Sequence, residues 1–169
     1  MCKKCDIAEK LLGYRDICPD SGKLEFTHDM LVKLGSNWCK RFGCSFVLPE
    51  LKSCNCTGEI PDIFAFKSGY SMMIECKTSR ADFLADKKKA FRINPELGMG
   101  QFRILLCPEG VIKPEDLKGI YENWFLLTVG QNKKIKLVVF PDSNYLNNPV
   151  HECNLMAERA LMASALRRR

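Results

Sequence analysis

The stretch PDIFAFKSGYSMMIECK, residues 61–77, carries the clearest structural signal in the chain. Two runs rich in apolar and aromatic residues, 62–66 and 71–77, flank the polar tetrapeptide Lys67-Ser68-Gly69-Tyr70. Runs of this kind on either side of a short turn containing glycine are typical of a β-hairpin. The sequence therefore predicts two antiparallel strands joined within residues 67–70.

The length of the turn decides which residues of the hairpin face one another. A two-residue turn at Ser68-Gly69 and a four-residue loop at 67–70 both place Asp62 opposite Glu75. A three-residue loop would shift this register. Directly opposed residues share a face of the sheet, with Cβ atoms ~5 Å apart. Lys77 lies two residues beyond Glu75 and therefore projects to the same face.

Two opposed carboxylates on neighbouring strands repel each other and weaken a sheet. A divalent cation between Asp62 and Glu75 would relieve the repulsion, and Mg²⁺ binds one or two carboxylates while leaving room for water and phosphate oxygens. The ammonium of Lys77 suits the same phosphate chemistry. If the two carboxylates are opposed and no metal is bound, either neutral substitution, Asp62→Asn or Glu75→Gln, is expected to stabilise the fold. The alternative is that both acids are exposed edge residues and Lys77 neutralises one of them.

The rest of the chain alternates helical and extended patterns, which favours one α/β domain with a mixed sheet flanked by helices. Gly43 is expected to end the first helix, and Ser79 to begin the second. In the second helix, Leu84 and Phe91 are expected to pack on the sheet. The expected helices are 27–42, 80–92 and 152–166, and the further strands are 45–51, 101–107, 124–129 and 135–140.

Composition and charge narrow the class of partner. Lys and Arg outnumber Asp and Glu by 26 to 20, and the surplus lies in residues 77–103 and in the tail 167–169. Such clustering favours a phosphate-bearing partner, although a solvated helix face would give the same count. No run approaches the ~20 apolar residues of a membrane helix, and no secretory signal is recognisable. We expect a cytoplasmic protein without membrane contacts, residues 1–169 forming one domain with an extension at 1–23 and a C-terminal helix and basic tail at 152–169.

The hairpin motif also resembles a known family. Pro61-Asp62, followed thirteen residues later by Glu75-Cys76-Lys77 at the end of an apolar strand, is similar to the PD-(D/E)XK, or restriction-endonuclease-like, nuclease motif. Residues 75–89, 98–103 and 124–127 resemble small phage and prophage members of that family.

The resemblance implies a mixed sheet between helices, with Mg²⁺ or Mn²⁺ as cofactor. It further implies hydrolysis of phosphodiesters in DNA, by an endonuclease or an exonuclease. Asp62 and Glu75 would bind the metal, and Lys77 would be the catalytic lysine. Members of the family often add an acidic residue, for which Glu50 is the first candidate and Glu25 the second.

A set of residues near the motif is expected to contact DNA: Arg80, Lys87, Lys88, Gln101 and Arg103. Arg80 and Lys87 would flank the packing stripe of the second helix beside Lys77. Gln101 and Arg103 share one face of a strand. If that is the face of Glu75, Arg103 would clamp a phosphate; the alternative is a surface ion pair with Glu96.

The chain has ten cysteines, which in a reducing compartment are free thiols, core residues or metal ligands. Cys2, Cys5, Cys54 and Cys56 could together hold Zn²⁺ or an iron–sulfur cluster, but we favour ordinary reduced cysteines. Four others, Cys39, Cys76, Cys107 and Cys153, lie in apolar patterns and are predicted to be core residues. His28 is expected to be solvated or capping, and neither it nor His151 supports a histidine-based site.

Two rival functions stay open beside the nuclease. The chain could be a DNA-binding module that keeps the fold with little activity. It could also be a cysteine–metal interaction protein whose basic helix binds RNA or a protein partner. A homodimer would suit an enzyme that cuts both strands, but the sequence does not test it.

Overall fold

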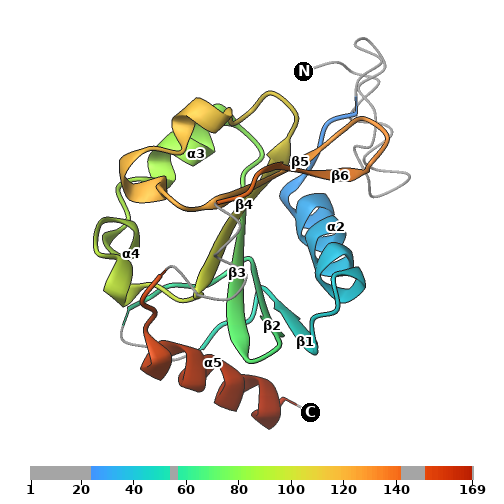
Figure 1. The fold of residues 1–169 in the computed structure, drawn as a ribbon. Helices are drawn as coiled ribbons and strands as arrows, with labels where there is room; N and C mark the ends of the chain where they lie inside the picture. Colours follow the sequence, from blue (N-terminus) through green and yellow to red (C-terminus); the bar gives the residue numbers. More distant parts are fainter. Residues whose placement is uncertain (1–23, 54–56, 142–150, 169) are drawn as a thin grey trace, which may run out of the picture.

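The computed structural model describes residues 24–53, 57–141 and 151–168. Its centre is a mixed six-stranded sheet with helices on both faces, as the sequence predicts (Figure 1). The strands, in spatial as well as chain order, are β1 Phe46–Pro49, β2 Ile63–Lys67, β3 Tyr70–Cys76, β4 Phe102–Pro108, β5 Phe125–Val129 and β6 Ile135–Val139. The α-helices are α2 His28–Arg41, α3 Arg80–Asp86, α4 Ala90–Ile93 and α5 Leu155–Arg167. Three single 3₁₀ turns are η1 Pro95–Leu97, η2 Pro114–Asp116 and η3 Gly119–Tyr121.

The strand directions explain where the connections lie. β1, β2 and β3 are antiparallel neighbours, whereas β3, β4 and β5 run parallel, and β6 returns antiparallel to β5. Parallel neighbours need crossover connections. The first crossover carries α3, α4 and η1, and the second carries η2 and η3. The carboxyl ends of β3, β4 and β5 therefore meet at one edge of the sheet.

The predicted hairpin register is confirmed within the strands. Lys67 pairs with Tyr70 and, at the far end, Ile63 pairs with Ile74. Ser68 and Gly69 both have positive φ, 51° and 87°, as a type I′ turn requires. The pairing stops at Ile63, so Asp62 lies one residue past the end of the ladder.

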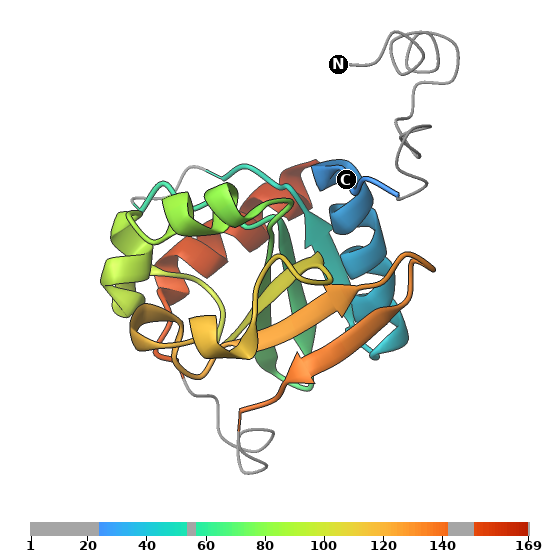
Figure 2. The same cartoon turned by 90° about the horizontal axis from the view of Figure 1, so that it is seen from above.

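Helix α2 covers one face of the sheet, and α3 and α5 cover the other (Figure 2). Thr27 caps α2 by accepting a hydrogen bond from the Met30 amide, and Gly43 follows the helix with φ 88°, as predicted. Under α2 lie the side chains of Ile74 and Cys76, so Cys76 is a core residue as predicted.

The predicted helix over 80–92 is wrong in its middle. Ser79 caps the start as expected, but the helix ends at Asp86 and a second short helix begins at Ala90. In one continuous helix, Asp86 and Arg92 would point about 120° apart, since successive residues turn by roughly 100°. The break lets both side chains enter the same buried cluster.

The break also changes which residues pack. Phe83 is fully buried, whereas Leu84 is 46% exposed and Phe91 only partly buried, so the predicted packing of Leu84 on the sheet is wrong. The α-helix predicted for 152–166 is observed at 155–167, with Asn154 as its cap. Within the described residues, no helix is both long and apolar enough to cross a membrane.

Candidate active site

The three motif residues lie where β2 begins and β3 ends. Glu75 is the penultimate residue of β3, Lys77 follows that strand directly, and Asp62 precedes β2. Glu75 and Lys77 are almost completely buried, with exposed fractions of 2% and 3%. They project to the face covered by α3, because residues along a strand alternate between faces.

Each carboxylate oxygen of Glu75 lies near a cationic group. Arg92 Nη2 is 2.9 Å from Glu75 Oε1, and Lys77 Nζ is 3.2 Å from Glu75 Oε2. The Arg92 contact has the distance of an ion pair without hydrogen-bond geometry. Glu75 is therefore neutralised within the fold; the sequence suggested Lys77 as a partner for one of the acids but not Arg92.

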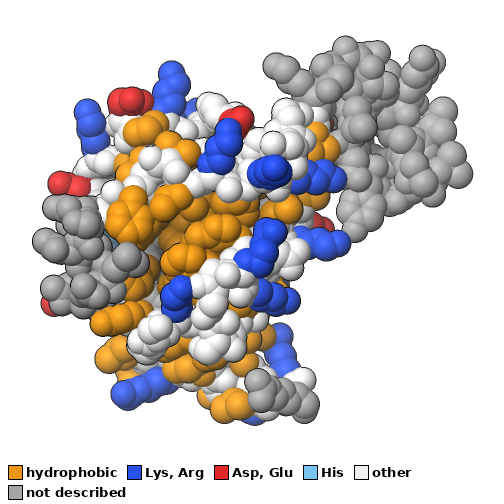
Figure 3. All heavy atoms as spheres, turned by 45° about the vertical axis from the view of Figure 1, so that its right-hand side comes forward, with side chains coloured by type: hydrophobic (Ala, Val, Ile, Leu, Met, Phe, Trp, Pro, Cys, Tyr) orange, Lys and Arg blue, Asp and Glu red, His pale blue; other side chains and the backbone are white. Residues whose placement is uncertain are grey.

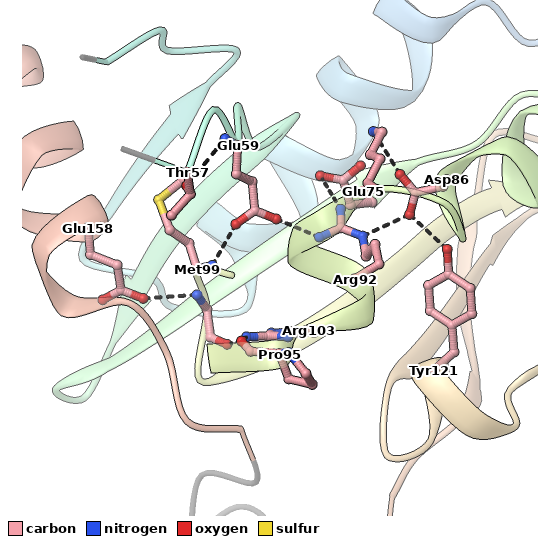
Figure 4. A network of polar contacts seen from close by, with 12 residues as sticks. Thr57, Glu59, Glu75, Asp86, Arg92, Pro95, Met99, Arg103, Tyr121 and Glu158 are labelled. Atoms are coloured by element: carbon pink, nitrogen blue, oxygen red, sulfur yellow. Dashed lines mark hydrogen bonds and ion pairs between the residues drawn. The ribbon is translucent and has the colours of Figure 1, made fainter. Parts of the chain in front are cut away.

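Asp86 holds the other side of the lysine. Its Oδ1 lies 3.1 Å from Lys77 Nζ, and its Oδ2 accepts hydrogen bonds from Tyr121 Oη at 2.7 Å and Arg92 Nε at 2.8 Å (Figure 4). Burial opposes the charge of Asp86, but Arg92 and Lys77 outweigh it and hold the pKa of Asp86 well below its usual value. Burial likewise lowers the pKa of Lys77, while Glu75 and Asp86 raise it above its usual value on balance.

Arg92 joins a third carboxylate to the cluster. Its Nη1 donates to Glu59 Oε1 at 2.5 Å, so its three guanidinium nitrogens each meet a different acid (Figure 4). Glu59 also accepts the Met99 amide at 2.6 Å, and burial raises its pKa. Three buried carboxylates thus share two buried cations. Lys89, half-exposed, adds a third cation at 2.7 Å from Asp86.

Asp62 adds a further negative charge at the edge of this cluster. Its Oδ2 accepts a hydrogen bond from the Cys76 amide at 2.7 Å, which holds the carboxylate beside the end of β3. Burial, followed by the charge of Glu75, raises the pKa of Asp62 to about 6. The side chain is 19% exposed, so one edge of the carboxylate reaches solvent.

Glu50 lies near Asp62, as the sequence suggested for an accessory acid. The Glu50 amide donates to the Asp62 carbonyl at 2.9 Å. His28 Nε2 sits between the two acids, 3.4 Å from Glu50 Oε1 and 3.6 Å from Asp62 Oδ1. His28 therefore belongs to the site, although we expected it to be solvated or capping. Glu25, the second candidate, is exposed ahead of α2.

The donor atoms suit a hard divalent cation in part. Among the described residues, no three His, Cys, Asp or Glu side chains converge as a protein-only metal cage would require. Mg²⁺ needs fewer protein ligands, because it retains several waters and is held by one or two carboxylates. The solvent-facing edge of Asp62 fits that role directly. Glu75 fits it through the second lone pairs of oxygens that already face Arg92 and Lys77.

The three residues predicted to contact DNA from the second helix differ in how free their side chains are to bind a phosphate. Arg80 is exposed and pairs through both terminal nitrogens with the carboxylate of Asp116. Lys87 is partly buried, its Nζ 5.0 Å from the Phe83 ring centroid. Lys88 is exposed. Lys88 is thus open to a phosphate, whereas Arg80 would have to share its charge with Asp116.

The predicted role of Arg103 as a phosphate clamp is wrong, although its side of the sheet is as expected. Arg103 pairs with Met73 in the parallel ladder and so shares the face of Glu75. Its side chain is 1% exposed and donates to the carbonyls of Gly100, Pro95 and Glu152. The alternative surface pair with Glu96 fails for the same reason, because Arg103 is buried.

Gln101 is also engaged within the fold. Its side-chain Oε1 accepts a hydrogen bond from the Ser71 backbone amide at 3.1 Å. The backbone amide of Gln101 donates to Ser71 Oγ at 3.0 Å. It bridges the start of β4 to β3. This contact leaves Gln101 a structural role and gives no support to the predicted DNA contact.

The cysteine predictions are tested only in part. Cys39, Cys76 and Cys107 are buried, as predicted, whereas Cys153 is intermediate in exposure. The four cysteines proposed as metal ligands, Cys2, Cys5, Cys54 and Cys56, lie outside the described residues.

No family model, curated protein sequence or solved structure matches the chain.

Proposed function

We propose that the chain is a Mg²⁺- or Mn²⁺-dependent nuclease that hydrolyses DNA phosphodiesters, with a restriction-endonuclease-like version of the observed mixed sheet. The observation that carries the proposal is the pair formed by Asp62 and Glu75 beside Lys77. Asp62 has a raised pKa, in part because of the charge of Glu75, and Lys77 Nζ lies 3.2 Å from Glu75. A cation placed beside two such carboxylates relieves their repulsion.

Each residue has a distinct task in the proposed reaction. Asp62 and Glu75, with Glu50 nearby, would hold the divalent cation, which would supply a water of lowered pKa and positive charge beside the scissile phosphate. The water oxygen would attack phosphorus and give up one proton to solvent, the phosphorus–oxygen bond to the leaving group would break, and the leaving oxygen would take up one proton from solvent. Lys77, fixed by Asp86, would stabilise the negative charge that develops on the phosphate.

A DNA-binding module with little activity is the second candidate, and one observation favours it. Glu75 already faces two cations, and Lys77 is 3% exposed. A substrate phosphate would therefore have to reach a glutamate–lysine pair that is almost completely buried. In this case the buried cluster would serve stability alone. Binding without cleavage would be the result.

Cleavage of supercoiled plasmid separates the two candidates. We expect the full chain to nick or linearise it in Mg²⁺ or Mn²⁺ and not in EDTA. Asp62→Asn should abolish cleavage, and Glu122→Gln, which removes an exposed carboxylate away from the motif, should leave it unchanged. Binding by the wild type without metal-dependent degradation of either supercoiled or linearised plasmid would establish the second candidate instead.

A further inference from the structure

An apolar groove opens on the face of the sheet opposite the candidate active site, beyond the carboxyl end of α2 (Figure 3). Its volume is about 140 Å³. Aromatic rings and one lysine dominate its lining: Trp38, Phe42, Lys67, Tyr70, Phe102 and Phe140. The sheet separates this groove from Glu75, since Met72 and Ile104, which also line it, belong to the α2 side.

The groove presents aromatic surface to solvent. Trp38 and Phe42 stack with their ring centroids 4.8 Å apart and their planes 11° apart. Phe42 is 38% exposed, Phe140 41% and Leu137 48%. A contiguous exposed apolar patch of this kind marks a binding surface on a soluble domain.

The charged residues in the outer segments that line the groove are all basic. The segments 38–46, 66–72 and 137–141 contain no Asp or Glu. Their basic residues are Lys40, Arg41 and Lys67. Figure 3 shows Lys and Arg side chains on both sides of the hollow. Lys67 Nζ donates a hydrogen bond to the Phe42 carbonyl and lies 3.6 Å from the centroid of the Phe42 ring.

The exposed aromatic rings and the positive charge of the groove together favour one class of partner. A second copy of the chain in the groove would bring like charges together, which is unfavourable. An acidic polypeptide would satisfy the cations without using the rings. Unpaired nucleobases stack on aromatic rings while the phosphates between them meet basic side chains, which uses both features.

We propose that this groove binds single-stranded nucleic acid, with a base packed against the exposed edges of Phe42 and Phe140 and phosphates beside Lys67 and Arg41. The inference is independent of the proposed hydrolysis. It rests on the groove alone and would hold for a chain that cuts nothing.

Fluorescence anisotropy with a labelled oligothymidylate of about 20 nucleotides tests the proposal. The full chain is used in EDTA, so that cleavage cannot interfere. Phe42→Leu keeps an apolar side chain but removes the ring, and we expect it to weaken binding at least about 5-fold. Phe42→Tyr keeps the ring and should stay within about 2-fold of wild type. Lys67→Ala should flatten the log–log salt dependence by about 0.7 for one lost single-strand phosphate.

Several results would overturn the proposal. These are equal affinity for a blunt duplex of the same length, wild-type affinity of Phe42→Leu, or competition by polyglutamate as strong as by unlabelled oligothymidylate. A dimer that Phe42→Leu dissociates would make the groove a self-interface. If Phe42→Leu unfolds, Phe140→Leu replaces it. Lys33→Ala, an exposed lysine of α2 that does not line the groove, should bind the oligonucleotide as tightly as wild type. Binding is measured in EDTA and cleavage in Mg²⁺, so the loss of hydrolysis and the loss of this site are distinguishable.

Discussion

The Arg92 guanidinium lies 2.9 Å from Glu75 Oε1, and the same side chain also contacts Glu59 and Asp86. One buried arginine thus holds three buried carboxylates from three separate parts of the chain. The carboxylate that the motif assigns to metal binding is therefore also part of a structural ion cluster. This double role changes what its removal should do.

Glu75→Gln should lower the free energy of unfolding in EDTA by about 3 kcal/mol, because breaking one partner of a buried ion cluster leaves uncompensated charge. This reverses the expectation from the sequence, which treated Glu75 as a repelled, unpaired acid. Chemical denaturation at neutral pH measures the change, with Glu122→Gln as control. If Glu75→Gln is as stable as wild type, the buried charge of Arg92 does not need Glu75 for its compensation.

Asp62→Asn should have the opposite effect and stabilise the protein in EDTA at pH 7 by about 1–2 kcal/mol. The folded pKa of Asp62 is about 6, above the usual value near 4, so the folded protein binds more protons than the unfolded chain between these values. Stability of the wild type should therefore fall as pH rises from about 4 to 6. The Asn amide can still accept the Cys76 hydrogen bond through its oxygen.

Melting curves of wild type and Asp62→Asn across pH 3.5–8 measure this difference. The two proteins should be equally stable below about pH 4 and diverge up to about pH 6. A constant difference at all pH values would show that Asp62 does not titrate in that window.

Asp86→Asn should reduce cleavage while leaving DNA affinity within a few-fold, because Asp86 fixes the position of the Lys77 ammonium 3.1 Å away. Asp86 also raises the pKa of Lys77, so its loss should move any lysine-dependent limb of the pH–rate profile to lower pH. Tyr121→Phe removes only one hydrogen bond to Asp86 and should cause a smaller loss. An unshifted pH profile in Asp86→Asn would restrict the residue to stability.

Lys88→Ala should flatten the log–log salt dependence of duplex binding by about 0.9, the value for one lost phosphate contact. Arg80→Ala should change it less, because Asp116 already pairs with Arg80. Lys33→Ala, an exposed lysine on α2, is the matched control. Equal slopes for all three variants would make the α3 region an ordinary solvated surface.

Local signals in the sequence predicted the hairpin, its register and the capped start of α3, since turn geometry and capping depend on neighbouring residues. The buried cluster was not predictable in this way. Glu59 lies in a loop, and Asp86 and Arg92 fall in a segment whose pattern favours one helix. Their convergence depends on a break at 87–89 that only the tertiary ion pairs explain. Arg103 shows the same limit, because alternation gives its face but not its burial.

We propose above that Asp62 and Glu75 share a divalent cation. Anomalous diffraction from a crystal soaked in Mn²⁺, which replaces Mg²⁺ and scatters anomalously, tests this directly. We expect one strong peak within bonding distance of both carboxylates, absent from Asp62→Asn crystals soaked identically. A structure without that peak, with Glu75 contacted only by Arg92 and Lys77, would show that the two carboxylates do not share a cation.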